Sequence, residues 1–222
     1  SRYMKQIILL CFLCISSNVV FGQVDTVEVY SKVMDQTIPN LIITPKDYTD
    51  QNDELPVLYL LHGAGGYFSN WFFRVPEIEQ YATDYNMIIV CPDGDKASWY
   101  IDSPIDSTSQ YESYITRELV PAIDQKYRTI KQKYGRAITG LSMGGHGAFY
   151  LAFRNQDIWG AAGSMSGGVN IIPFAEEWNI DEILGPYAQY KKNWEDNTVI
   201  NLTHLLNGCL LYTSDAADDL RG

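Results

Sequence analysis

The sequence has 222 residues, of which 46% are hydrophobic and 19% are charged, a balance that is typical of a globular protein and excludes disordered and collagen-like classes. Its length suits one sizeable hydrophobic core and is short for two ordinary domains. The net charge of −11 argues against a protein that binds nucleic acid or an anionic membrane, because such binding depends on basic patches.

The first 22 residues have the features of a signal peptide with a little upstream sequence. Methionine and lysine at positions 4–5 precede an apolar run over residues 7–13, which is shorter than the ~20 residues of a membrane span. Val20 and Gly22 occupy the −3 and −1 positions of a cleavage site. We therefore expect cleavage after Gly22 and a periplasmic or secreted protein that is not held in a membrane.

The body of the chain alternates between predicted strands and helices. Alternating β-branched residues predict two leading strands, over residues 25–34 and 39–44. Continuous apolar runs, typical of strands buried on both faces of a parallel sheet, follow at 56–61, 87–91, 136–139 and 161–164. Helices are predicted over residues 77–85, 112–127 and 145–154. This order indicates an α/β fold with a mostly parallel, doubly wound sheet.

Two parts of the body depart from this regular pattern. Pro121 lies inside the second predicted helix and is expected to bend it. Residues 171–197 are irregular, acidic and aromatic, so we expect them to form an excursion over the sheet.

The last residues, 209–222, break abruptly from what precedes them and resemble translated adapter sequence. We therefore expect the natural gene to continue beyond about Leu206, and we assign residues 23–208 to one incomplete domain; a genuine short acidic tail is the alternative. Of the four cysteines, only Cys91 lies in the body, so no disulfide framework is expected.

The pentapeptide Gly140-Leu-Ser-Met-Gly144 carries the clearest chemical signal. It follows a predicted buried strand and precedes a predicted helix, which is the context of a G-x-S-x-G nucleophile elbow. Glycines suit this turn because side chains there would collide with the neighbouring strand and helix. The motif predicts Ser142 as a nucleophile; a glycine-rich turn with an idle serine is the alternative.

A second glycine-rich loop, residues 62–66, follows the strand predicted at 56–61. A tetrahedral oxyanion needs two backbone N–H donors. Met143, the residue after the nucleophile, supplies one in this interpretation, and Ala64 supplies the other, with Gly63 and Gly65 as alternatives.

These motifs resemble the "putative esterase" branch of the α/β-hydrolase superfamily, which includes S-formylglutathione hydrolases, feruloyl and acetyl-xylan esterases, tributyrin esterases and mycolyltransferases. The matching segments are 60–66 with Trp71, 92–94, 98–100, 102–104, 140–148 and 164–168. The resemblance implies an α/β-hydrolase fold and hydrolysis of a carboxylic ester through an acyl-enzyme, with neither a metal nor an organic cofactor.

The sequence departs from this family after the nucleophile. The family's triad runs Ser, then Asp or Glu, then His along the chain. His62 precedes Ser142 and belongs to the oxyanion loop, His146 should point into the scaffold, and His204 follows Ser142 without an intervening acid strand. We therefore expect the sheet to lack its last strands, the triad acid and histidine to lie beyond this chain, and the chain as given to be inactive or nearly so.

Four residues are candidates for substrate binding: Trp71, Trp99, Tyr100 and Asp102. They follow the carboxyl ends of the strands predicted at 56–61 and 87–91, where open α/β sheets bind ligands. Their aromatic faces suit a sugar or a phenolic acyl group, although aromatic residues that cover the sheet end are an equal alternative.

Two classes of function remain open. One is an exported serine esterase for a small-molecule or carbohydrate ester, or an acyltransferase on the same scaffold. The other is a catalytically silent module that binds a carbohydrate or a partner.

Overall fold

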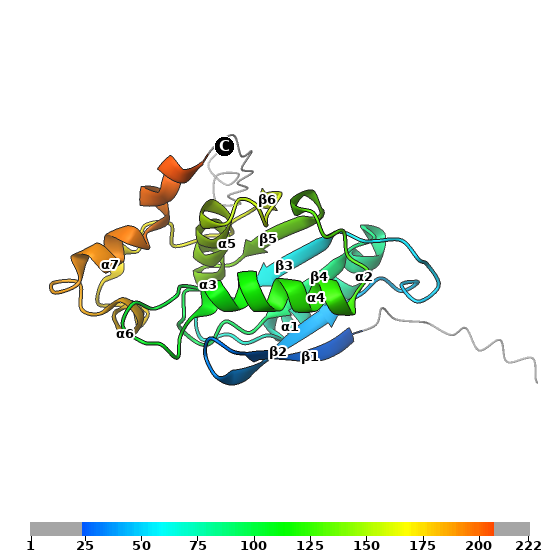
Figure 1. The fold of residues 1–222 in the computed structure, drawn as a ribbon, viewed down its shortest axis with the longest axis horizontal. Coiled ribbons are helices and arrows are strands. Elements are labelled where there is room, and N and C mark those ends of the chain that lie inside the picture. Colours follow the sequence, from blue (N-terminus) through cyan, green and yellow to red (C-terminus); the bar gives the residue numbers. More distant parts are fainter. Residues whose placement is uncertain (1–23, 207–222) are drawn as a thin grey trace, which may run out of the picture.

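A computed structural model describes residues 24–206, so the predicted signal peptide and residues 209–222 lie outside the described residues. Its first two strands form a hairpin at one edge of the sheet (Figure 1). β1 (Val24–Ser31) and β2 (Gln36–Ile43) pair antiparallel from Val24 opposite Ile43 to Ser31 opposite Gln36. The first strand was predicted too long, because the chain turns between residues 32 and 35 and Asp35 takes a φ of 52° there.

The remaining strands give the sheet its mostly parallel character. β3 (Val57–Leu61), β4 (Ile88–Pro92) and β5 (Arg136–Gly140) follow the predicted apolar runs, and β6 (Ala161–Ala162) is shorter than predicted. The sheet order is β1-β2-β4-β3-β5-β6; β3 pairs parallel with β4 and β5, and β5 with β6. Among these six strands, β2 alone runs opposite to the others, because it pairs antiparallel with both β1 and β4. The predicted α/β sheet is confirmed.

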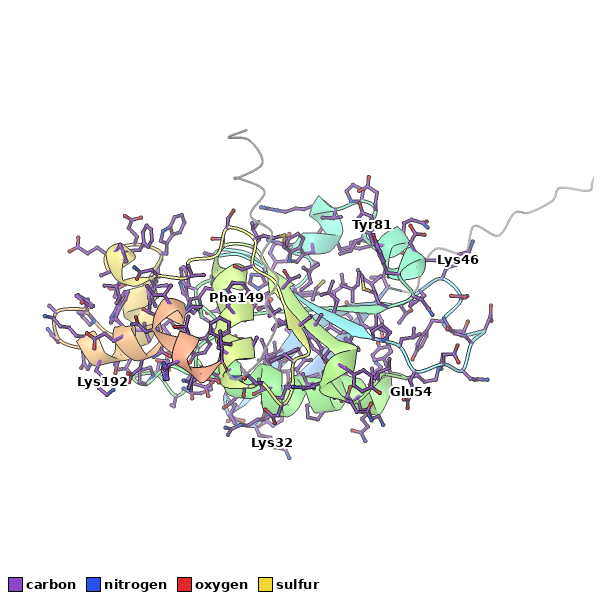
Figure 2. All side chains as sticks on the ribbon, turned by 90° about the horizontal axis from the view of Figure 1, so that it is seen from above. Lys32, Lys46, Glu54, Tyr81, Phe149 and Lys192 are labelled. Atoms are coloured by element: carbon purple, nitrogen blue, oxygen red, sulfur yellow. The ribbon has the colours of Figure 1, made fainter. Side chains whose placement is uncertain are left out.

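Helices cover both faces of the sheet. α1 (Asn70–Arg74) and α2 (Ile78–Asp84) lie on one face, where Leu60 and Ile89 pack with Ile78. α4 (Val120–Lys126) and α5 (Met143–Arg154) lie on the other, packed in one core with Tyr59 and Leu61. Figure 2 shows Tyr81 of α2 on the opposite side of the sheet from the green α4. Alternate residues of one strand therefore supply two separate cores.

The predicted helix at 112–127 forms in three pieces. α3 (Tyr111–Ser113) leads into a π-helical stretch, η1 (Tyr114–Leu119), and α4 then begins just before Pro121. A proline has no N–H and its ring crowds the carbonyl four residues earlier, so a wider turn before it relieves both problems.

The region predicted to be irregular, residues 171–197, contains three short helical segments, and a fourth follows it directly. They are η3 (Ile172–Phe174), α6 (Ile180–Leu184), α7 (Lys191–Asp196) and η4 (Val199–Leu205). We call residues 171–205 the outer segment; its α6 and α7 lie apart from the sheet, at the left of Figure 1.

A single turn, η2 (Lys133–Gly135), precedes β5. No helix within residues 24–206 combines the length and the apolar character needed to cross a membrane.

Candidate active site

Ser142 sits at the sharp turn between β5 and α5. Its backbone has φ 57° and ψ −116°, a conformation that costs a non-glycine residue about 1–3 kcal/mol. The N–H of Ser142 donates to the carbonyl of Met165 over 2.9 Å, and its carbonyl accepts from the N–H of His146 over 3.0 Å. The side chain is exposed. The structure therefore presents the Ser142 hydroxyl to solvent on a backbone that is fixed on both sides.

The glycines on either side of Ser142 allow this turn to form. A Cβ atom on Gly144 would lie 2.5 Å from the carbonyl oxygen of Leu61, and one on Gly140 would lie 2.5 Å from that of Gly144. Both distances are too short for real atoms. The crowding expected from the motif is present, and it brings the start of α5 directly against the end of β3.

The loop after β3 runs beside Ser142. A Cβ atom on Gly63 would lie 3.5 Å from that of Ser142. The N–H of Gly65 donates to the carbonyl of Lys96 over 2.7 Å, and that of Gly66 donates to Gly63 over 3.0 Å. These two donors are engaged within the loop, which removes Gly65 as an alternative oxyanion donor and leaves Ala64 and Gly63. Met143 begins α5, where the first N–H groups of a helix point outward.

His62 holds this loop to the one that follows β4. Its side chain is buried, and its Nε2 accepts from the N–H of Gly94 over 2.9 Å. The proton of the neutral ring therefore lies on Nδ1, which is 2.9 Å from the carbonyl oxygen of Gly63. Burial lowers the pKa of His62 and favours this neutral form.

His146 points into the scaffold, as predicted. Its Nδ1 lies 3.1 Å from the carbonyl oxygen of Trp99 and its Nε2 lies 3.1 Å from that of Asn197. The ring is fully buried and stacks on Tyr150. Burial lowers the pKa of His146 to about 4, although both carbonyls favour the protonated ring. His146 thus connects the nucleophile helix with two other segments.

The third histidine lies on the outer segment. His204 is exposed, and its Nδ1 is 2.8 Å from the carbonyl oxygen of Asn201 on its own 3₁₀ turn. Within residues 24–206, no hydrogen bond joins any of the three histidines to Ser142.

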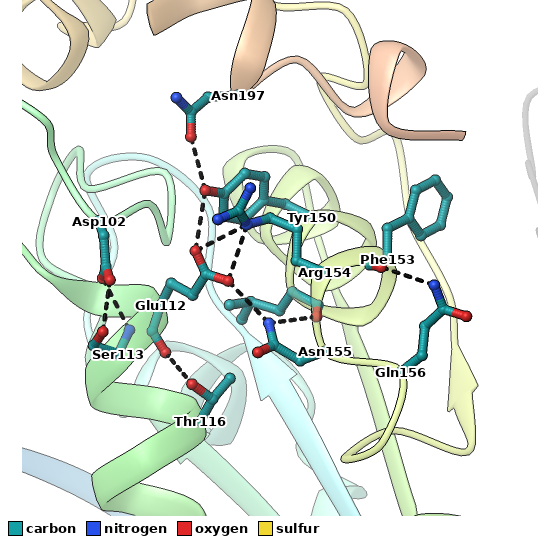
Figure 3. A network of polar contacts seen from close by, with 11 residues as sticks. Asp102, Glu112, Ser113, Thr116, Tyr150, Phe153, Arg154, Asn155, Gln156 and Asn197 are labelled. Carbon is teal, nitrogen blue, oxygen red and sulfur yellow. Dashed lines mark hydrogen bonds and ion pairs between the residues drawn. The ribbon is translucent and has the colours of Figure 1, made fainter. Parts of the chain in front are cut away.

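Three of the four residues predicted to bind substrate are tied into the framework. Trp99 is buried, with its ring edge on His146. Tyr100 has no exposed surface, and its hydroxyl donates to the carbonyl of His62 over 3.0 Å. The carboxylate of Asp102 accepts from the N–H and the hydroxyl of Ser113, at 2.9 and 2.6 Å (Figure 3). In these positions they shape the loops around Ser142.

Trp71 lies on the other side of the nucleophile turn. Its indole N–H donates to the carbonyl of Leu61 over 3.0 Å, and the ring is half-buried. It lines a small cavity of about 30 Å³ together with His62, Gly63 and Leu141. Of the four candidates, Trp71 retains an exposed part of its ring beside the loop of residues 62–66.

A polar network that was not predicted from the sequence braces α5. The buried carboxylate of Glu112 accepts from Arg154 Nε over 3.0 Å and from Asn155 Nδ2 over 3.0 Å (Figure 3). The Tyr150 hydroxyl donates to the side-chain oxygen of Asn197 over 2.7 Å. These contacts fasten the far end of α5 to α3 and to the outer segment. No sequence motif marks them.

A cleft beside the oxyanion loop was also not predicted. The cleft has a volume of about 520 Å³ and lies between that loop, the residues after β4 and the outer segment. Its walls include Ala64, Asp95, Lys96, Trp178 and Glu182. The one sequence feature that could have indicated this cleft is the tryptophan in the acidic run at 176–178.

Comparison with known proteins agrees with this geometry. The sequence profile of the family described as "Putative esterase" matches residues 31–206. Esterase Rv1288 of Mycobacterium tuberculosis is 34% identical over 133 residues, which cover 59% of this chain and 29% of that protein. The chain thus spans less than a third of the length of the curated relatives that it matches.

Solved structures show the same fold. A ferulic acid esterase superposes with a TM-score of 0.71 at 27% identity, over 85% of this chain and 74% of that one. The S-formylglutathione hydrolase FrmB of Staphylococcus aureus superposes with a TM-score of 0.73 at 18% identity, over 90% of this chain and 84% of that one. The chain belongs to this esterase family and has an α/β-hydrolase fold.

Proposed function

We propose that the protein is a serine esterase that hydrolyses a carboxylic ester through an acyl-enzyme on Ser142. The observation that carries this proposal is the exposed Ser142 hydroxyl on a strained turn, with the start of α5 and the glycine loop beside it. Strained backbone of this kind persists where the surroundings hold it in place, and it is common at active sites.

The chemistry follows from these positions. The Ser142 hydroxyl oxygen attacks the ester carbonyl, and its proton passes to a base; the carbonyl oxygen becomes an oxyanion. The N–H groups of Met143 and Ala64 stabilise that oxyanion in this proposal. The alcohol then leaves with a proton, and water releases the acid from Ser142. Because no histidine of the described part is bonded to Ser142, the proposal assigns the base to none of the three.

We further propose a carbohydrate ester as the substrate. The cleft beside Ala64 supports this choice, because it combines charged side chains with the exposed ring of Trp178. The same acyl-enzyme would also serve an acyltransferase, because only the acceptor differs.

A fluorophosphonate probe tests the nucleophile. It should label the full-length wild-type protein at Ser142 and leave the full-length Ser142→Ala variant unlabelled, with the modified peptide identified by mass spectrometry. Equal labelling of the two proteins would contradict the assignment.

A catalytically silent binding module is the second candidate. The absence of a histidine bonded to Ser142 within residues 24–206 favours it, because a serine without a base is a poor nucleophile. A folded wild-type protein that takes up no probe would support this candidate over the esterase.

We also propose that the protein is exported, on the signal-peptide features of residues 1–22. The exported protein should begin at Gln23, which N-terminal sequencing of the periplasmic or secreted fraction would detect. Recovery of uncleaved protein inside the cell would count against export.

A further inference from the structure

The cleft beside the oxyanion loop has a composition that suits a particular kind of ligand. Its rim is polar, with Asp95, Lys96, Asn179 and Glu182, and all four of these side chains are exposed. Trp178 adds a large ring that is 57% exposed. A ligand in this cleft would meet several hydrogen-bonding groups and one flat apolar face at the same time.

Backbone strain is concentrated around the same place. Within residues 24–206, nine residues other than glycine have positive φ, and three of them line the cleft: Asp95, Trp178 and Asn179. Ser142 itself is a fourth residue with positive φ. The left-handed region is rare for a bulky residue such as tryptophan. Strain of this kind gathers at ligand-binding and catalytic sites, where surrounding contacts hold it.

The Trp178 position is fixed from outside its own segment. The indole N–H of Trp99 donates to the carbonyl of Trp178 over 3.3 Å, and Asn179 Nδ2 donates to Glu182 over 2.7 Å. Trp99 in turn contacts His146, four residues after the nucleophile. The backbone of Trp178 is therefore linked through Trp99 to the helix that follows Ser142.

Charge narrows the choice of ligand. The cleft carries two carboxylates, Asp95 and Glu182, against one ammonium group, Lys96, so it disfavours an anionic ligand. Hydroxyl groups can donate to the carboxylates and accept from the ammonium group. A phenolic acyl group would stack on the indole but would leave most of these polar groups without partners.

We propose that this cleft holds the neutral glycosyl part of the ester substrate, with a sugar ring stacked on the Trp178 indole and its hydroxyls on the charged rim. This inference rests on the proposed esterase function. Ala64, the proposed oxyanion donor, lies in the wall and places the cleft beside the reacting ester. The charged rim assigns it to the alcohol side, because sugar hydroxyls can partner these groups and a phenolic acyl group cannot.

Titration calorimetry on the 222-residue chain tests the inference without any hydrolysis. Xylotetraose and cellotetraose are the neutral probes; xylotetraose that bears one glucuronic acid and reduced glutathione are the anionic ones. At least one neutral probe should bind, and Trp178→Ala should weaken it at least tenfold. Trp178→Phe, which keeps a flat ring, should lose less. Tyr134→Ala removes another exposed ring, one that is not in the cleft wall, and should bind as the wild type does.

Circular dichroism confirms that each variant is folded before titration. The inference is overturned if neither neutral probe binds, if folded Trp178→Ala binds as tightly as the wild type, or if an anionic probe binds more tightly than the neutral ones. The double variant Asp95→Asn/Glu182→Gln removes both carboxylates. It should reduce the ratio of the affinity for neutral probes to the affinity for anionic probes.

The sugar-binding test and the test of the proposed esterase function can succeed or fail independently. Ser142→Ala should keep the Trp178-dependent binding while losing the fluorophosphonate label. Sugar binding through Trp178 in a wild-type protein that takes up no label would contradict the esterase and leave the binding site in place.

Discussion

The turn that carries Ser142 and the outer segment are held by different kinds of contact. At the turn, main chain packs directly on main chain, and Gly144 lies against the carbonyls of Leu61 and His62. The outer segment contributes buried apolar side chains to the core, and side chains from the rest of the chain reach its carbonyls: Trp99 to Trp178, Ser103 to Ile183, and His146 to Asn197. The Ser142 turn thus tolerates almost no change, whereas the position of the outer segment depends on side-chain packing and on a few side-chain hydrogen bonds.

Gly144→Ala should give the largest effect, because it places a Cβ atom 2.5 Å from a main-chain oxygen that belongs to the central strand β3. We expect the free energy of unfolding to fall by about 3 kcal/mol or more, since neither backbone can move without disturbing the core. Urea denaturation followed by circular dichroism measures it. A loss below about 1 kcal/mol would show that the turn is less rigid than its packing indicates.

Acidification should weaken the link between the two regions. His146 is buried as a neutral ring with a pKa of about 4, below the ordinary value of 6.5 that it regains on unfolding. The unfolded chain therefore binds the proton more readily, so this contribution to stability is full above pH 6.5 and is lost as the pH falls towards 4. The loss amounts to about 3 kcal/mol, and the lowered pKa of His62 adds a loss of the same sign.

Urea midpoints at pH 7 and pH 4.5 measure this effect. His146→Gln should reduce the difference between the two midpoints, while His204→Gln, which changes an exposed histidine, should leave it unchanged. An unaltered pH dependence in His146→Gln would mean that other groups cause the acid sensitivity.

Trp194→Phe should loosen the outer segment alone. Trp194 is fully buried, and its indole N–H donates to the carbonyl of Gly185 over 2.8 Å. The variant loses this bond and leaves the carbonyl without its donor, which costs about 1–2 kcal/mol. Proteases should then cleave within residues 171–205 more rapidly, while fluorophosphonate labelling of Ser142 stays the same.

The matched control changes an exposed residue of the same segment. Ile200→Ala removes a side chain that is largely exposed, so the cleavage rate should not change. If Trp194→Phe also abolished labelling, the two regions would be coupled more closely than their contacts suggest.

The same contrast explains which parts of the structure could be predicted from the sequence. Apolar runs and the glycine motif predicted β3, β4, β5 and the Ser142 turn closely, because local pattern and global packing demand the same residues there. α5 begins at Met143, two residues before its predicted start, because the turn itself opens the helix. The Glu112 network left no local pattern, and the Trp178 cleft left only a tryptophan in an acidic run, since both features join segments that are far apart in the chain.

The residues predicted to bind substrate show that side-chain orientation could not be predicted from the sequence. Sequence position correctly indicated that Trp99 and Tyr100 lie near the loops around Ser142, but not which rings would face inward. Both residues have positive φ, which reverses the direction that an extended chain would give their side chains. Such conformations depend on tertiary contacts, here with Gly94 and Gly147 against the Tyr100 ring.

Gly65→Ala should have the smallest effect on stability. It distinguishes two reasons why a position needs glycine: close packing and a positive φ. No atom lies within 4 Å of a Cβ on Gly65, so the site has room, but its φ is 72°. Only the backbone conformation is penalised, at about 1 kcal/mol. Gly65→Asn should cost less, because asparagine tolerates the left-handed region. Urea denaturation should rank the variants Gly65→Asn, Gly65→Ala and Gly144→Ala in increasing loss of stability. If Gly65→Ala were as damaging as Gly144→Ala, close packing would not be what distinguishes the Ser142 turn from the loop beside it.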